Sequence, residues 1–133
     1  MDKQTNTPED WRILAERDLS VADHLAVNMI PYPTEIIAFH CQQAAEKYLK
    51  GVLQMMGVNP PFIHDLDRLC SMAMKQRPSF VDISSQCTVI NYFSVQPRYD
   101  SGVNLSEADM RLVLEHTKAI KEFLEKEVPE LFK

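Results

Sequence analysis

The clearest candidate for chemistry is a run of polar residues on one side of a predicted helix. The segment FHCQQAAEKYLKG, residues 39–51, carries His40, Gln43, Lys47 and Lys50 at three- and four-residue steps. At about 100° per residue, the four side chains fall within roughly 80° of each other. Two ammonium groups one turn apart can hold phosphate oxygens, while an imidazole and an amide can hydrogen-bond a base, a sugar or a partner. The alternative, which spacing alone favours, is a solvated face with a modest Glu46–Lys50 ion pair.

Two short motifs supply further candidate binding residues. In His64-Asp65, the carboxylate can orient or charge the imidazole. The preferred alternative is that one of the two residues caps the helix that follows. In Arg98-Tyr99, within a predicted loop, the guanidinium can hold a phosphate while the ring stacks on a base. A structural interpretation, in which the arginine closes a helix end and the tyrosine packs in the core, stays equally open.

Arg111 and His116 form a third candidate pair with the spacing R-x4-H. Positions five apart on an ideal helix point about 140° away from each other. His116 falls within a predicted apolar stripe, and Arg111 points the other way. We therefore predict a core histidine satisfied by a hydrogen bond rather than half of an active site. The stripe consists of Leu112, Val113, Ala119, Ile120, Phe123 and Leu124.

The bulk composition limits the classes of function. The chain has 133 residues, of which 45% are hydrophobic and 25% charged, as expected for one soluble domain. A net charge of −5 argues against a general nucleic-acid coat protein but allows a local basic site. No metal-ligand cluster, phosphate-binding loop or hydrolase signature occurs, so we expect no metal, no cofactor and no reaction named by a motif. The three widely spaced cysteines predict buried small side chains rather than disulfides.

No membrane or export signal is found in the sequence. No apolar run approaches the roughly 20 residues of a membrane span. The N-terminal MDKQTNTPED is polar and lacks the apolar region of a signal peptide. We therefore expect a cytoplasmic protein.

The elements that must position the candidate residues are helices. Glycine is scarce, with 3 in the chain, and no stretch resembles a sheet strand, so the fold is predicted to be all-α. Thr7-Pro8 predicts the start of a first long helix that ends at Pro31. The other predicted helices run from Thr34 to Gly57, from about Leu66 to Arg77, from a cap at Ser79 to about Phe93, and from Ser106 to Pro129. Short connections predict one domain, residues 1–133 with a core of about 11–124, as an antiparallel up-and-down bundle of four or five helices.

With these motifs placed, the chain resembles the HEPN domain family. These are small helical domains often encoded beside minimal nucleotidyltransferases in prokaryotes. The resemblance runs from about Trp11 to Phe123, and the stretch 15–19 fits the usual first helix. Its clearest part is the segment 39–51, which is similar to the family helix F-x-x-Q-Q-A-x-E-K-x-x-K. The segments His64-Asp65-Leu66 and Arg98-Tyr99 match an H-D-L segment and a late R-Y pair.

The resemblance implies a helical bundle that is usually a homodimer and associates with nucleotides or RNA. Many relatives are metal-independent ribonucleases with an R-x4–6-H motif, in which a polar residue typically follows the arginine. Here Leu112 follows Arg111. Other relatives are non-catalytic and bind nucleotides or nucleotidyltransferase partners.

We therefore expect a non-catalytic domain that binds a nucleotide or RNA. It would act with a minimal nucleotidyltransferase in a toxin–antitoxin-like or defence system. Phosphate binding is assigned to Lys47, Lys50 and Arg98. Orientation or stacking is assigned to His40, His64 and Tyr99, and Gln43 is a further candidate nucleotide-binding residue. One alternative is a metal-independent ribonuclease toxin that uses Arg111 and His116, and another is a purely structural adaptor.

Overall fold

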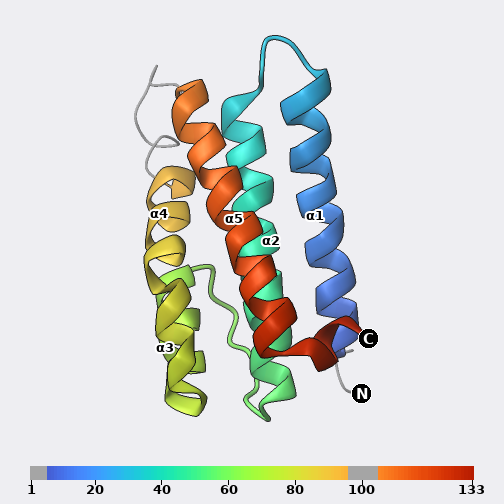
Figure 1. Ribbon diagram of the computed structural model, residues 1–133, viewed down its shortest axis with the longest axis vertical. Coiled ribbons are helices and arrows are strands. Elements are labelled where there is room, and N and C mark those ends of the chain that lie inside the picture. The colour runs from blue at the N-terminus through green and yellow to red at the C-terminus, as the bar shows by residue number, and fades with distance from the viewer. Residues whose placement is uncertain (1–5, 96–104) are drawn as a thin grey trace.

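The computed structural model describes residues 6–95 and 105–133. Within these ranges, helices are the only regular secondary structure (Figure 1). The helices pack as a bundle, which confirms the predicted all-α fold. In chain order the elements are α1 (Pro8–Asn28), α2 (Thr34–Met55), α3 (Leu66–Gln76), the 3-10 helix η1 (Pro78–Ile83), α4 (Ser84–Val95), α5 (Glu107–Glu127) and the 3-10 helix η3 (Pro129–Phe132).

The arrangement places α2 at the centre of the bundle. Helices α1 and α2 form an antiparallel hairpin, and α5, α3 and α4 pack against α2 from the other sides. The connection between α2 and α3 runs back along the bundle before α3 begins (Figure 1). This return brings the end of the connection beside the middle of α2.

Three helix starts follow local capping signals. The Thr7 hydroxyl accepts a hydrogen bond from the Asp10 backbone N–H, and the Asp10 carboxylate accepts one from the Thr7 N–H. Asp65 caps α3 by accepting from two backbone N–H groups of its first turn. The Ser106 hydroxyl caps α5 by accepting from the Asp109 backbone N–H. Each cap satisfies donors that have no partner within the helix, and the predicted starts are confirmed.

Two predicted boundaries differ from the structure. Helix α2 ends at Met55, and Gly57 follows with a φ of 80°. The Gly57 and Val58 N–H groups close a Schellman motif on the last turn, for which glycine is suited because it lacks a Cβ. The predicted cap at Ser79 is wrong. Its hydroxyl donates to Glu127 at 2.9 Å, residues 78–83 form a 3-10 helix, and α4 begins at Ser84.

The core is built around the apolar face of α2. Residues 37, 41, 44, 45, 48 and 52 are buried as predicted, whereas Met55 at the end of the helix is 38% exposed. Small side chains on both helices, such as Ala15, Ala22 and Ala44, let α1 approach α2 closely. All three cysteines are buried and free, as expected. Among the described residues, no helix is long and apolar enough to cross a membrane.

Candidate functional site

Asp18 joins two of the predicted binding residues across the seam between α1 and α2. One carboxylate oxygen accepts a hydrogen bond from His40 Nδ1 at 2.9 Å, and the other accepts from Lys47 Nζ at 2.6 Å. The Asp18 side chain is 13% exposed, against 27% for His40 and 23% for Lys47. We call these three residues the Asp18 bridge. The carboxylate therefore lies deeper in the molecule than the two nitrogen donors that it holds.

A second polar group surrounds the buried carboxylate of Glu46. Its oxygens accept from Lys50 Nζ at 2.9 Å, from Gln42 Nε2 at 3.2 Å and from His64 Nδ1 at 3.0 Å. Glu46, Lys50 and Gln42 are each no more than 6% exposed. The Lys50 ammonium also lies 5.7 Å from the centre of the Trp11 ring. Several hydrogen bonds compensate for burying this charged pair, as a stable fold requires. We call Glu46, Lys50, Gln42 and His64 the Glu46 cluster.

These contacts divide the polar run of α2 into two parts. Lys50 is enclosed, so the interpretation of the run as a solvated face is wrong for this residue, although the predicted Glu46–Lys50 pair is present. His40, Gln43 and Lys47 remain partly exposed. Gln43 Nε2 donates to the Gln42 side-chain oxygen at 2.8 Å and so connects the exposed part to the Glu46 cluster.

The His64-Asp65 pair has two separate roles. Asp65 caps α3, as the preferred interpretation stated, and also accepts from Asn91 Nδ2 at 3.2 Å. The His64 ring contacts Glu46 of α2 instead of its neighbour, while its backbone carbonyl accepts from Gln42 at 2.9 Å. The His64 side chain is 80% exposed. It therefore lies at the solvent edge of a buried ion pair.

Arg98 and Tyr99 lie outside the described residues, so their roles stay predictions. Three residues of the network were missed by sequence reasoning, namely Asp18, Gln42 and Trp11. Asp18 and Trp11 come from α1, and their positions depend on how the α1–α2 hairpin pairs. Gln42 and Glu46 are part of the quoted motif helix, but their burial depends on the returning connection that ends at His64.

Arg111 is committed to contacts with the end of the α1–α2 hairpin. Its Nη2 donates to the Ala26 carbonyl in the last turn of α1 at 3.1 Å, and its guanidinium lies 4.9 Å from the centre of the Tyr32 ring. Its Nε also approaches Glu107 at 3.4 Å. A cation at a helix C-terminus is favourable both for the orphan carbonyl and for the helix dipole. These contacts give Arg111 a structural function.

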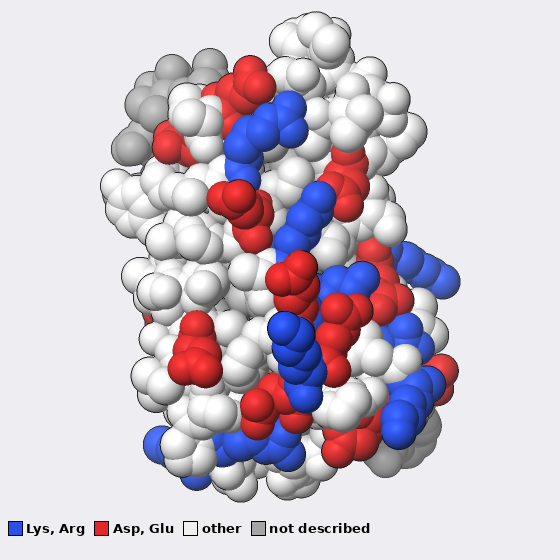
Figure 2. Space-filling view, viewed as in Figure 1, with Lys and Arg blue, Asp and Glu red and all other residues white. Residues whose placement is uncertain are grey.

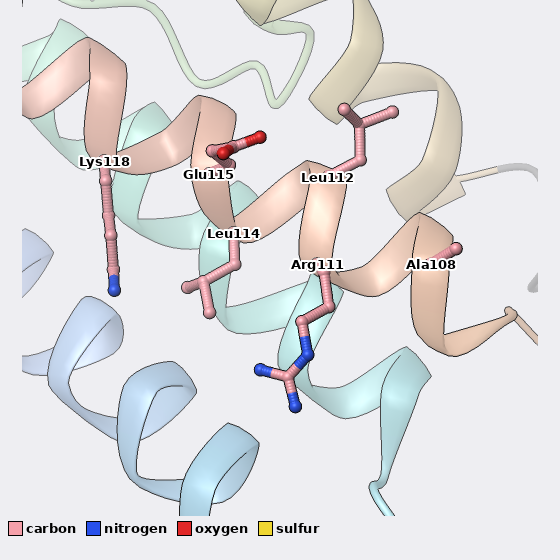
Figure 3. A pocket seen from close by; sticks show the side chains of 6 residues that line it. All are labelled: Ala108, Arg111, Leu112, Leu114, Glu115 and Lys118. Carbon is pink, nitrogen blue, oxygen red and sulfur yellow. The ribbon is translucent and has the colours of Figure 1, made fainter.

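The groove beside Arg111 shows how the residues of α5 are distributed. It has a volume of about 490 Å³ and is lined by Ala108, Arg111, Leu112, Leu114, Glu115 and Lys118. In Figure 3, Arg111, Leu114 and Lys118 point toward α1, whereas Leu112 and Glu115 point away from it. Lys118 Nζ pairs with Asp23 of α1 at 2.7 Å. Both cations of the groove are thus already bonded to α1.

His116 does not take the predicted position in the core. It is only partly buried, and the described part of the chain offers it no hydrogen bond, so the predicted satisfied core histidine is wrong. The neighbouring Thr117 is fully buried instead, with its hydroxyl donating to the Val113 carbonyl at 2.8 Å. The buried stripe of α5 shares Val113, Ile120 and Leu124 with the predicted one. Met110, Leu114 and Thr117 complete it in place of the predicted Leu112, Ala119 and Phe123.

The charge distribution is mixed on the face shown in Figure 2. Basic and acidic side chains alternate down the bundle, and the described residues form no continuous basic patch in this view. Several charged side chains of the described residues are paired, as in Lys118–Asp23 and Arg77–Glu127. Such a face lacks the concentration of positive charge with which proteins hold a nucleic-acid backbone. A phosphate site on this face must therefore be local.

The chain matches the HEPN domain family over residues 8–128, a range that includes all five α-helices of the described structure. The chain belongs to this family. No curated protein matches it. The motif helix on which the resemblance depends is α2, and it supplies residues to both the Asp18 bridge and the Glu46 cluster.

Proposed function

We propose that this HEPN domain is a non-catalytic binding domain that holds a phosphate group of a nucleotide or RNA at the α1–α2 seam. The observation that carries the proposal is the grouping of His40, Gln43 and Lys47, which lie on one partly exposed face of α2. The imidazole and the ammonium already bind the two oxygens of one carboxylate. Donors that fit a carboxylate in this way are suited to the oxygens of a phosphate as well.

The remaining predicted residues take different parts in this proposal. The Lys50 ammonium is buried and bonded to Glu46, so we assign it to holding α2 and the returning connection in place. His64, 80% exposed, lies at the edge of the Glu46 cluster and is available for stacking or hydrogen bonding. Arg98 and Tyr99 are kept as candidate contacts on the strength of their match to the family's R-Y pair.

The arrangement of α5 favours a binding domain over a ribonuclease. The guanidinium of Arg111 is occupied by Ala26, Glu107 and Tyr32. Arg111 points toward α1 in Figure 3, and an ideal helix turns His116 about 140° away from it. A general acid or base and a phosphate-binding arginine must both reach the same reacting group. The different directions expected for Arg111 and His116 on one helix therefore support the binding domain over the ribonuclease.

The proposal is tested by titrating the protein with ATP, GTP and a short single-stranded RNA, followed by analysis of the RNA for cleavage. Binding raises the melting temperature by mass action. Lys47→Met removes the ammonium but keeps an apolar stem, and it should abolish the shift. Lys75→Met, at an exposed position on α3, makes the same charge change away from the seam and should not.

The outcomes separate the candidate functions. Equal binding by wild type and Lys47→Met would contradict the phosphate site. Metal-independent cleavage of the RNA that disappears in Arg111→Ala or His116→Ala would establish the ribonuclease instead. If the protein neither binds these ligands nor cleaves the RNA, a structural adaptor is favoured.

We further propose that the domain forms a homodimer and acts with a minimal nucleotidyltransferase in a toxin–antitoxin-like or defence system. Family membership supports this part of the proposal. Light scattering on the purified protein tests the dimer. Co-purification with a nucleotidyltransferase encoded by a neighbouring gene tests the partner, and a monomer that captures no such protein would contradict both.

A further inference from the structure

The Asp18 carboxylate occupies the two strongest donors of the proposed phosphate site. Each of its oxygens is bonded to a different donor, with His40 Nδ1 at 2.9 Å and Lys47 Nζ at 2.6 Å. Both distances are those of strong, charge-assisted hydrogen bonds. The two donors come from α2, whereas the acceptor comes from α1.

From this geometry we infer that Asp18 is a built-in competitor for the phosphate of the ligand. A carboxylate and a phosphate present the same kind of oxygen acceptor to an ammonium and an imidazole. The bridge is accessible on the side of the donors, because Lys47 and His40 are about twice as exposed as Asp18. A phosphate that approaches from solvent must therefore share these donors with Asp18 or displace it. The inference rests on the proposed function and adds to it a control of ligand affinity.

The charges of the bridge give the direction of the effect. The single negative charge of Asp18 cancels the positive charge of Lys47, so the free site has little attraction for an anion. A bound phosphate would also be held close to a carboxylate of the same sign, where like charges repel strongly. Neutralising Asp18 should consequently raise the affinity for phosphate-bearing ligands and leave the affinity for an uncharged nucleoside unchanged.

The substitution Asp18→Asn tests this with little change in shape. We expect it to lower the Kd for ATP on the order of tenfold, the result of about 1.4 kcal/mol of binding free energy. The Kd for adenosine should stay the same, which separates the phosphate from the base. Asp23→Asn is the matched control. Asp23 lies on the same helix, and its substitution also breaks an ion pair to a lysine and changes the net charge equally. That lysine, however, is Lys118 of α5, which is no part of the proposed site.

The results distinguish this inference from the proposed function. Tighter ATP binding by Asp18→Asn alone supports the competitor. If the wild type binds ATP, Lys47→Met does not, and Asp18→Asn binds no more tightly than the wild type, the competitor is overturned and the phosphate site is left intact. If Asp18→Asn and Asp23→Asn raise the ATP affinity equally, the effect comes from net charge, and the competitor role of Asp18 is overturned too. No ATP binding by any variant overturns both proposals.

A second measurement covers the case in which Asp18→Asn does not fold. In the wild-type protein, saturating ATP should shift the NMR signal of the Asp18 carboxyl carbon, because the ligand takes over its hydrogen bonds. The signal of the Asp23 carboxyl carbon should remain in place. An Asp18 signal that is unchanged at saturation would overturn the competitor.

Discussion

Replacing Lys50 by methionine tests whether the buried ion pair holds the bundle together. The Lys50 and Glu46 side chains are 7% and 6% exposed, and their charged atoms lie 2.9 Å apart. Methionine retains an apolar stem of similar length beneath Trp11, so the packing loss is small. The Glu46 carboxylate, however, loses its cation. Breaking a buried pair on one side costs about 3–5 kcal/mol, because an uncompensated charge is left inside.

The contacts of Glu46 place the expected cost at the lower end of this range. Gln42 and His64 still donate to the carboxylate after the substitution. We therefore expect Lys50→Met to lower the free energy of unfolding by about 3 kcal/mol. Domains of this size unfold with about 5–15 kcal/mol in total, so the loss is measurable and leaves a folded protein. Adding Glu46→Gln to Lys50→Met removes the orphan charge. The double variant should therefore be about 2 kcal/mol more stable than the sum of the two single-variant losses predicts.

Urea denaturation followed by circular dichroism measures these values. Asp23→Asn breaks an exposed pair, in which the Asp23 and Lys118 side chains are 45% and 49% exposed, and it should cost less than about 1 kcal/mol. If Lys50→Met lowered the free energy of unfolding by as little as Asp23→Asn does, the reasoning would be refuted. Strict additivity of the losses from Lys50→Met and Glu46→Gln would refute it as well.

Three further predictions follow from the packing of α2. Gly51→Ala should lower the free energy of unfolding by about 1–3 kcal/mol in urea denaturation, because the added Cβ would lie 3.0 Å from Trp11 Cβ. A stabilised variant would show that α1 moves to accommodate the added methyl group. Tyr48→Phe should raise that free energy by up to about 1 kcal/mol, since the buried hydroxyl finds no partner in the described part of the chain; a loss would reveal one. Burial raises the pKa of Cys41 from 9.0 to about 12 and raises the pKa of Tyr48, so the unfolded chain releases these protons first. Urea midpoints should therefore fall as pH rises above about 9, and Cys41→Ala combined with Tyr48→Phe should flatten that fall.

The helix starts could be predicted from sequence because capping is a local interaction. The bonds at Thr7, Asp65 and Ser106 join residues two or three positions apart. The apolar face of α2 was predictable for a similar reason, since its periodicity repeats over several turns. Ser79 shows the limit of local signals. Its hydroxyl bonds to Glu127, a residue 48 positions away, and this tertiary contact replaces the expected cap.

The candidate site required information that the sequence does not contain. The spacing of His40 and Lys47 was visible, but their common acceptor, Asp18, belongs to another helix. Lysine is usually a surface residue, but Lys50 is buried because Trp11 of α1 covers it and Glu46 lies beside it. Both errors have the same origin, since periodicity locates a face of a helix without showing which neighbour covers it.

The motif helix of the family thus combines two functions that different measurements can separate. Gln42, Glu46 and Lys50 hold the connection that returns along α2, so changes to them should alter stability. Lys47 lies at the partly exposed seam, so changes to it should alter ligand affinity. A match to the motif alone therefore does not distinguish a binding domain from a structural adaptor. If Lys47→Met lowered stability as much as Lys50→Met and changed no affinity, the whole motif would serve the fold, and the adaptor would be the better description of this protein.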